Sequence, residues 1–398
     1  MTVEVTGAAA VGERASDPDL LYSEAEEDLR AAVRSLLAAR AEPAAILGRI
    51  ETGDPYDPAL WRALATDMGT AGLLVPEKLG GQGASAREAA VVLEELGRAA
   101  VPAPYLTSAV LVVETLLGCE PEASEEPEAP EVARLLASFA SGRTVGALAL
   151  PLPTGPGSAL ACEVRVAADG TLEGGARRVA DAAGAHTLLI PARGPEGVEL
   201  YAVDTSAAGV TVSPLVSLDL TRPLADVAFA GVRGRRLAGP GVAEAAVRRA
   251  LLAGAGLLAS EQLGVAEWCL SETVRHMGER KQFNRPVGSF QALKHRLARL
   301  WLDIVSARAT ARYAADALAS GSADAPVAVA VAQSACSKAA VRAAEECVQL
   351  HGGIGMTWEH PAHLYLKRAK ADEIALGTPS HHREILAELV NLPSPTAG

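Results

Sequence analysis

Apolar residues at helical spacing dominate both ends of the chain. Near the start, Ser23 and Glu26 form the capping pattern S-x-x-E, and Leu29, Val33 and Leu37 then fall on one face of a helix. Similar signals predict further helices over the ranges 59–68, 85–98 and 105–117. The first 140 residues are therefore expected to form a helical domain.

Between residues 141 and 240 the pattern changes to period two and to short apolar runs. Gly, Pro or Asp residues separate these runs, which therefore indicate strands. The predicted strands cover residues 144–150, 163–166, 187–190, 198–203, 210–212 and 225–230. Because they are short and evenly spaced, we expect an antiparallel β-barrel or sandwich.

From residue 241 to residue 398 long helical patterns return. Residues 250–266 carry a single charge, Glu261, so this helix is expected to be buried on most sides. Residues 327–331 alternate like a strand, but the length of the segment 324–350 favours a helix. A stripe in residues 289–320 is interpreted as core: Leu293, Leu297, Leu300, Trp301, Ile304 and Val305. We expect a four-helix-bundle-like domain, and hence an α+β protein of three domains.

Composition narrows the possible functions. The 398 residues suffice for two or three domains and are 49% hydrophobic. A formal net charge of −12 argues against a sequence-independent nucleic-acid binder, because such proteins present a basic face. The five cysteines form no C-x-x-C pattern, which argues against a disulfide framework or a metal site. No signal peptide or membrane span is recognised, so a cytoplasmic protein is expected.

A glycine-rich stretch and an acidic run are each explained by structure and not by ligand binding. Residues 80–83, Gly-Gly-Gln-Gly, follow no predicted strand and precede no Lys-Ser/Thr pair, so a turn is favoured over a phosphate loop. The acidic run 119–131 is interpreted as a solvated surface connection.

The segment 279–291, ERKQFNRPVGSFQ, concentrates groups that can bind a ligand. Arg280 offers a guanidinium fork, Gln282 an amide and Phe283 a flat apolar ring. This set suits an anionic and partly aromatic molecule. Taken alone it is weak, because an arginine at a helix end is more often a solvated cap.

Two later motifs extend this pattern, Q-x-x-G-G-x-G at residues 349–355 and G-T at residues 377–378. In this order and at these spacings, the three motifs resemble the flavin-dependent acyl-CoA dehydrogenase family. The resemblance implies an FAD cofactor, an acyl-CoA substrate, and an electron-transfer flavoprotein or similar acceptor. It also implies that FAD is held by Arg280, Gln282, Phe283, Gln349, Gly352, Gly353 and Thr378.

The same resemblance reveals two positions without a catalytic base. Family members remove the substrate α-proton with a carboxylate, usually in an E-G-T turn, where this chain has Leu376. Other members carry the base on the helix before the R-x-Q-F motif, at the position of Gly254. Glu261 lies about 10 Å further along that helix and is the candidate for a displaced base, or else a structural ion-pair partner. Asp372 and Glu373 are weaker candidates.

Segments that hold the flavin ring in the family are also altered here. The family's T-E/S-x-x-x-G-S stretch corresponds to residues 152–158, shortened and without a carboxylate. Its W-I-T-N-like strand corresponds to residues 178–181, where Arg178 replaces the aromatic residue. The segments that reach a neighbouring subunit's cofactor match the family, except that Asn284 stands in place of a glycine.

In this family each cofactor is shared between subunits. A chain that keeps the half serving its neighbour but lacks a base resembles a subunit of the heterotetrameric actinobacterial acyl-CoA dehydrogenases. We therefore expect α,β-desaturation of an acyl-CoA in a complex with a related subunit that supplies the base. Three alternatives stay open: a self-sufficient homotetramer that uses Glu261, a non-redox acyl-CoA-binding or lyase-like member, and a ligand-free scaffold. The sequence leaves the acyl group undetermined.

Overall fold

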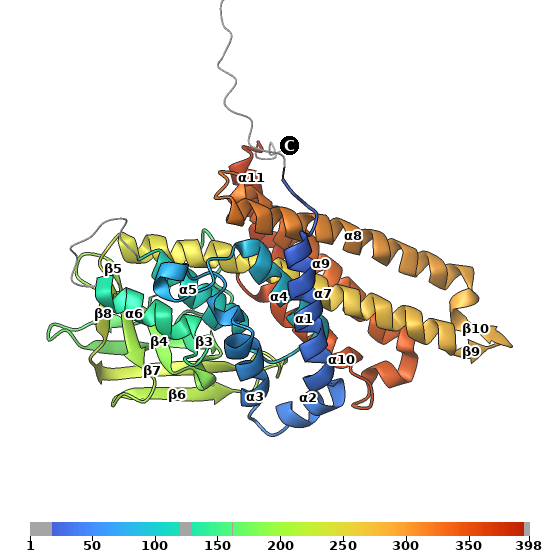
Figure 1. The fold of residues 1–398 in the computed structure, drawn as a ribbon, viewed down its shortest axis with the longest axis horizontal. Helices are drawn as coiled ribbons and strands as arrows, with labels where there is room; N and C mark the ends of the chain where they lie inside the picture. The colour runs from blue at the N-terminus through green and yellow to red at the C-terminus, as the bar shows by residue number, and fades with distance from the viewer. Residues whose placement is uncertain (1–17, 120–128, 161, 394–398) are drawn as a thin grey trace, which may run out of the picture.

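Helices form the N-terminal part of the molecule, a β-sheet the middle, and long helices the rest (Figure 1). The computed structural model describes residues 18–119, 129–160 and 162–393. The order of helical, β and helical parts is the α+β architecture that the sequence predicts.

The N-terminal part consists of short helices. Its α-helices are α1 (Glu24–Arg40), α2 (Pro43–Ile50), α3 (Pro58–Trp61), α4 (Ala86–Ala99), α5 (Val113–Leu117) and α6 (Ala129–Ala140). Two π-helical segments continue α3 and precede α5, η1 (Arg62–Asp67) and η4 (Tyr105–Val112). The predicted helices at 59–68 and 105–117 are therefore present, although each contains a π-helical stretch.

Local capping signals place two of these helices correctly. Ser23 accepts a hydrogen bond from the backbone N–H of Glu26, whose carboxylate accepts one from Ser23 N–H at 2.7 Å. Ser85 and Glu88 form the same reciprocal pair at the start of α4. The glycine-rich stretch 80–83 forms the predicted turn.

Helix α6 was not predicted from the sequence. Val132, Leu136 and Phe139 lie buried on one of its faces at helical spacing, so the apolar pattern for it was present in the sequence. The acidic run that precedes it lies mostly outside the described residues.

The middle of the chain forms one eight-stranded sheet. Its strands are β1 (Gly146–Leu148), β2 (Arg165–Val166), β3 (Leu172–Ala180), β4 (Thr187–Arg193), β5 (Val198–Asp204), β6 (Val210–Leu215), β7 (Leu224–Val232) and β8 (Arg235–Ala238). The order is β6-β7-β3-β2-β4-β5-β8, and β1 pairs with β4. The pairings are antiparallel, except those of β4 with β1 and with β2. The sheet does not close into a barrel, so the barrel alternative is corrected to an open, mostly antiparallel sheet.

The central strand β4 is buried on both of its faces. In β4, Leu189 joins the main core shared with the helices, whereas Leu188 and Ile190 join a smaller core with Phe229 of β7. Burial on both faces explains why β4 is a continuous apolar run in the sequence. Strands β3 and β8 were not predicted, because the glycines and arginines of β3 interrupt the period-two pattern and β8 is short.

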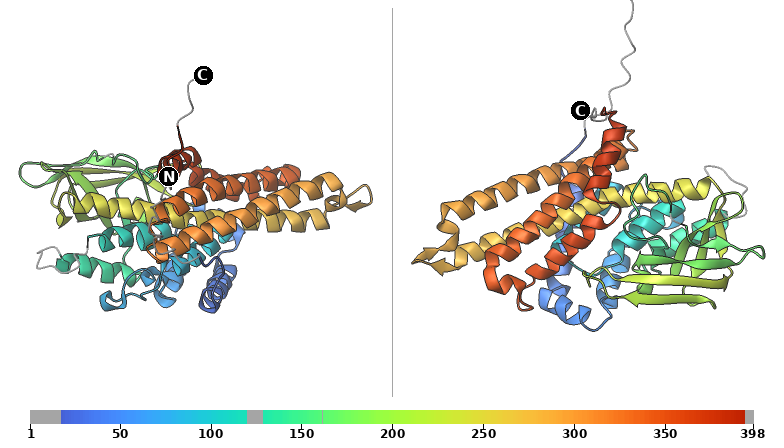
Figure 2. Two further views of the ribbon diagram at one scale, coloured as in Figure 1. Left: turned by 90° about the horizontal axis from the view of Figure 1, so that it is seen from above. Right: turned by 180° about the vertical axis from the view of Figure 1, so that it is seen from behind.

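The C-terminal helices pack as a bundle (Figure 2). They are α7 (Val242–Glu279), α8 (Gln291–Ala319), α9 (Ala325–His351), α10 (Ala362–Ile374) and α11 (Pro379–Leu389). The strand alternative for residues 327–331 is wrong, since they lie in α9. Within the described ranges, no helix is both long and apolar enough to cross a membrane.

Helix α4 joins this bundle by crossing α7 at close range. A Cβ placed on Gly264 of α7 would lie 1.9 Å from the carbonyl oxygen of Glu94, and one on Gly97 would lie 2.1 Å from that of Glu261. Only glycine permits this approach, so the two glycines allow α4 to pack directly against the backbone of α7.

The apolar stripe of α8 is core along only part of its length. Leu300 and Ile304 are buried, but the side of Trp301 and Val305 faces outward, and Trp301 is 55% exposed. Leu293 and Leu297 are half-buried. The interpretation of the whole stripe as core is therefore corrected.

Candidate cofactor and acyl site

The R-x-Q-F motif forms a hairpin at the far end of α7 (Figure 1). Arg280 caps α7, and β9 (Lys281–Gln282) pairs with β10 (Arg285–Pro286). The two turn residues, Phe283 and Asn284, have φ of 53° and 61°. Positive φ at both central positions is the type I′ pattern, in which asparagine is well tolerated. The replacement of the family's glycine by Asn284 is thus compatible with the turn.

The hairpin presents its ligand-binding groups to the outside. Arg280 and Gln282 are exposed, and the Phe283 ring is 86% exposed. The ring has an edge-to-face contact with Phe290 at 6.1 Å, and the Arg285 guanidinium lies 4.0 Å from the centre of the Phe290 ring. A single exposed apolar ring is common on protein surfaces, so it points to a binding site only together with the exposed Arg280 and Gln282 of the same hairpin.

The glycine motif lies at the same end of the bundle. Gln349 is exposed in the last turn of α9, and Gly352 follows the helix with a φ of 65°. Cβ atoms placed on Gly352 or Gly353 would meet nothing within 4 Å, so their backbone is open to a ligand. The ring of His351 lies 4.3 Å from that of His276 in the last turns of α7, which places this motif beside the base of the hairpin.

Thr378 is apart from the other six predicted cofactor residues. It caps α11, accepting a hydrogen bond from the backbone N–H of His381. It lines an open groove of about 910 Å³, together with Lys338, Arg342 and Arg383. Lys338, Arg342 and Gln349 all lie on α9, and Gln349 is about 16 Å beyond Lys338 and about 10 Å beyond Arg342 along the helix axis. Thr378 and the hairpin end are therefore connected along one helix, but do not form one compact site.

The two expected base positions face each other. Leu376 is buried, and a Cβ placed on Gly254 would lie 3.1 Å from its Cδ1. The cavity beside Leu376 has a volume of only about 20 Å³, room for about one water molecule. It is lined by Thr107, Leu111, Leu148, Leu150, Pro151, Leu152, Ala180, Leu251 and Leu376.

The segments expected to enclose a flavin ring contact one another directly. The backbone N–H of Leu152 donates to Arg178 O at 3.1 Å, and that of Leu376 donates to Leu152 O at 2.8 Å. A Cβ on Gly155 would lie 2.8 Å from the carbonyl oxygen of Leu376. A tricyclic ring does not fit between backbones that are hydrogen-bonded to each other. The residues of this region do not match a flavin ring site.

Glu261 belongs to a buried ion-pair network. Arg222 and Arg368 both donate to its Oε1 atom, Arg368 at 2.7 Å. Burial alone would raise the pKa of Glu261, but the two guanidinium groups outweigh it and hold the pKa below its usual value. Glu261 is not among the residues that line the small cavity. The geometry therefore matches the structural interpretation of this residue.

Two acidic neighbours behave differently from Glu261. Asp372 is buried 3.2 Å from Arg222, and burial together with Glu261 raises its pKa to about 7. Glu373 lines the groove near Thr378 and lies 3.7 Å from Lys370. Neither residue lines the cavity beside Leu376.

Sequence reasoning missed the arginines of this network. Arg222 follows the sheet strand β6, and Arg368 lies in α10, where its Nε is 3.2 Å from Asp219. Their partners lie far away in the chain. The single charge in the apolar stretch of α7 was the available signal, because a buried carboxylate requires a cation nearby.

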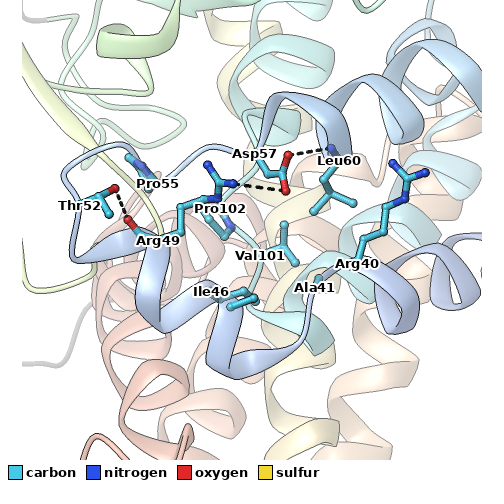
Figure 3. A pocket seen from close by; sticks show the side chains of 11 residues that line it. Arg40, Ala41, Ile46, Arg49, Thr52, Pro55, Asp57, Leu60, Val101 and Pro102 are labelled. Carbon is cyan, nitrogen blue, oxygen red and sulfur yellow. Dashed lines mark hydrogen bonds and ion pairs between the residues drawn. The ribbon is translucent and has the colours of Figure 1, made fainter.

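A separate cleft of about 360 Å³ lies between the end of α1 and α2 (Figure 3). Arg40 and Arg49 flank it, and Ile46, Leu60 and Val101 contribute apolar surface. The Arg49 guanidinium donates to the carbonyl oxygen of Tyr56 at 3.0 Å and lies 3.7 Å from Asp57. None of the predicted site residues lines this cleft.

Solved structures include close structural matches. A chain of the ChsE4-ChsE5 complex from Mycobacterium tuberculosis is 30% identical with a TM-score of 0.81, covering 94% of this chain and 100% of that one. A chain of a variant of the Tcur3481-Tcur3483 steroid ACAD is 29% identical with a TM-score of 0.80, covering 92% and 98%.

Sequence comparisons agree with these structural matches. The family "Acyl-CoA dehydrogenase, N-terminal domain" matches residues 23–123, and "Acyl-CoA dehydrogenase, C-terminal domain" matches residues 244–390. The acyl-CoA dehydrogenase IpdE2 of Mycobacterium tuberculosis is 36% identical over 366 residues, covering 92% of this chain and 96% of that protein. This chain therefore belongs to the acyl-CoA dehydrogenase family, whose members are flavin-dependent oxidoreductases acting on CH–CH bonds.

Proposed function

We propose that this chain is one subunit of a mixed acyl-CoA dehydrogenase complex, in which it completes the FAD site of a related partner. The partner supplies the catalytic base and the ring-binding half of the site. The complex desaturates an acyl-CoA between its α and β carbons and passes the electrons to an electron-transfer flavoprotein or similar acceptor. The observation that carries this proposal is the filled space around Leu376, combined with an exposed cofactor-binding end.

The exposed end has the chemistry for the diphosphate and adenine part of FAD. Arg280 can bind phosphate oxygens with two parallel N–H groups, and Gln282 and Gln349 can add hydrogen bonds. The open backbone at Gly352 and Gly353 allows close approach, and the Phe283 ring offers a flat apolar face. When bound, FAD supplies the hydride acceptor, whereas this chain's residues bind and orient its far end.

The alternatives have less support. A self-sufficient enzyme needs a base at the acyl group, and Glu261 is paired with two arginines outside the cavity. A non-redox acyl-CoA-binding or lyase-like member that uses the family's acyl position needs a pocket beside Leu376, but the cavity there is about 20 Å³, far below the usual several hundred. A ligand-free scaffold leaves the exposed Phe283 and its polar neighbours unexplained.

The related assemblies support a two-component complex. The matched solved structures are the ChsE4-ChsE5 complex and the Tcur3481-Tcur3483 protein, and the latter is described as a steroid ACAD. A steroid-derived acyl-CoA is therefore the first substrate class to test.

The direct test compares two preparations. One is the chain purified alone, and the other is the chain co-purified with a related subunit that has the E-G-T turn. We expect flavin absorbance and dehydrogenation, followed with an artificial electron acceptor, only in the co-purified complex. General-base catalysis commonly contributes about 10²–10⁴-fold, so the isolated chain should show no significant turnover. Robust turnover by the chain alone would overturn the proposal.

Arg280→Ala probes the contribution of this chain to the shared site. Loss of a charge-assisted hydrogen bond should weaken FAD binding by about 1.5–3 kcal/mol, measured as flavin content of the complex after dilution. Arg62→Ala, at an exposed arginine of the N-terminal part, is the matched control. Equal flavin retention in both variants would show that Arg280 is only a helix cap.

A further inference from the structure

Three side chains with metal-binding atoms converge beside the glycine motif. Glu272 lies on α7, His351 is the last residue of α9, and His360 precedes α10. Their ligand atoms all lie within 4.8 Å of one another. The Glu272 Oε1 atom is 3.8 Å from His351 Nε2 and 3.3 Å from His360 Nε2. The three residues come from separate segments, so the fold alone brings them together.

His351 has a buried nitrogen without a hydrogen-bond partner. Its side chain is fully buried, and its Nδ1 lies 2.7 Å from the carbonyl oxygen of Cys347. Because a carbonyl oxygen only accepts, Nδ1 carries a proton, and in the neutral imidazole the lone pair is then on Nε2. This Nε2 makes no hydrogen bond and faces the Glu272 carboxylate. A lone pair and a carboxylate facing each other are stabilised by a cation between them.

The arrangement around His351 is that of a metal-binding histidine. Such histidines usually donate their second N–H to a carbonyl or carboxylate, which fixes the tautomer and the ring orientation. Cys347 O serves this role for His351. The Cys347 thiol lies 3.6 Å from Nδ1, the nitrogen that does not face Glu272. The donor set is therefore two imidazole nitrogens and a carboxylate oxygen.

Two neighbouring contacts set the conditions for binding. The backbone N–H of Ala362 donates to His360 Nδ1 at 3.2 Å, so binding through Nε2 requires the proton to move to Nδ1 and this contact to be lost. Arg275 donates to both carboxylate oxygens of Glu272, from Nε to Oε2 at 2.9 Å and from Nη2 to Oε1 at 2.5 Å, and also to Glu279 at 2.7 Å. Because Arg275 is exposed and has this second partner, it can leave Glu272 without losing all of its hydrogen bonds.

We propose that Glu272, His351 and His360 bind a divalent transition metal ion, with zinc as the best match. Two histidines and one carboxylate are a known zinc donor set, and they leave a fourth position for water. Glu272 and His360 are partly exposed, so the ion can enter from solvent. The ion would tie α7 to the connection between α9 and α10, directly beneath Gly352 and Gly353. This inference is independent of the proposed function.

Metal titration of the purified full-length chain tests the site. After treatment with a chelator, we expect one equivalent of Co²⁺ to bind, with visible ligand-field absorption and no thiolate charge-transfer band. Zn²⁺ should displace it and raise the thermal unfolding temperature. His360→Gln and Glu272→Gln should each weaken binding by at least tenfold. His295→Gln, at an exposed histidine of α8, should leave binding unchanged.

The partly exposed positions are chosen because replacement of the buried His351 could disturb folding. Circular dichroism of each variant establishes that it is folded before binding is compared. No stoichiometric binding of Co²⁺ or Zn²⁺ would overturn the proposal. Equal binding by the wild type and both site variants would also overturn it, and a thiolate band would contradict the donor set.

Discussion

Leu376 combines a strained backbone with a closely packed side chain. Its φ of 53° lies in the left-handed region, which costs a residue other than glycine about 1–2 kcal/mol. The side chain is buried against the position of Gly254, and its carbonyl oxygen accepts a hydrogen bond from His382 at 3.0 Å. Leu376 therefore occupies a left-handed turn position, and the space in front of its side chain is filled.

Leu376→Glu should not create an active enzyme from the isolated chain. The new carboxyl group would enter an apolar cavity of about 20 Å³, where an unpartnered polar group costs at least about 1–3 kcal/mol. We expect lower stability in urea unfolding and no dehydrogenation. Leu376→Met, which conserves volume, should cost less than about 1.5 kcal/mol. Desaturation by the isolated Leu376→Glu variant would mean that a flavin ring does fit this region.

Asp372 should make the stability of this chain depend on pH. Its pKa is about 7 when folded and 3.8 in the absence of the fold, so the native state retains a proton that the unfolded chain releases. The contribution of this carboxyl group to stability is fully present below about pH 4 and is lost as the pH rises through 7. The slope approaches one proton, about 1.4 kcal/mol per pH unit.

Asp372→Asn should remove that slope between pH 4 and pH 7. The measurement is the difference in unfolding free energy between wild type and variant in urea at several pH values, which cancels the other titrating groups. The exposed Asp28→Asn serves as the control. Parallel stability profiles for wild type and Asp372→Asn would show that Asp372 stays ionised in the fold.

At the scale of elements, the crossing of α4 and α7 favours glycine over alanine, the opposite of the usual preference in helices. Alanine usually stabilises a helix relative to glycine by up to about 1 kcal/mol. At Gly264 the added methyl group would meet the backbone of α4 at 1.9 Å, and backbone atoms cannot move aside as a flexible side chain can. The contact between these helices therefore depends on the absence of a side chain.

Gly264→Ala should destabilise the chain by about 1–3 kcal/mol, the usual cost of overpacking. Gly278→Ala is a matched control on the same helix, because a Cβ at this position would meet nothing within 4 Å. We expect the control to be neutral or slightly stabilising in thermal unfolding. If both substitutions had the same effect, α4 and α7 would have to cross at a greater distance than described here.

At the scale of the whole molecule, α8 presents an apolar surface that nothing in the described chain covers. Trp301, Leu302 and Val305 are all exposed on this helix. Exposed apolar patches of this kind often mark contacts between proteins. The proposed mixed complex provides a covering surface, and it also brings the hairpin end to a partner.

Trp301→Lys should prevent or weaken assembly without destabilising the isolated chain. A lysine desolvated in an apolar contact carries a large cost, whereas the same lysine on a free surface is well hydrated. The measurements are the mass of the co-purified complex in solution and the thermal unfolding of the isolated chain. Arg62→Ala, remote from α8, should leave the mass unchanged. An intact complex with Trp301→Lys would exclude this part of α8 from the interface.

Local interactions made several features predictable from the sequence alone. The capping pairs at Ser23 and Ser85 act within one turn, so their residues mark helix starts wherever the helix later packs. The motif around Phe283 and Asn284 was recognised from its residue types, whereas its hairpin form is a finding of the structure. That Arg280, Gln282, Gln349, Gly352 and Gly353 bind FAD stays a prediction.

The tertiary structure decided what depends on segments distant in the chain. It placed Leu376 against Gly254, gave Glu261 its partners Arg222 and Arg368, and separated Thr378 from the hairpin end. It also left the sheet open and Trp301 exposed. Periodicity shows which face of an element is apolar, but not which other segment covers that face. Sequence thus determined elements and local chemistry, whereas long-range packing determined which chemical groups meet.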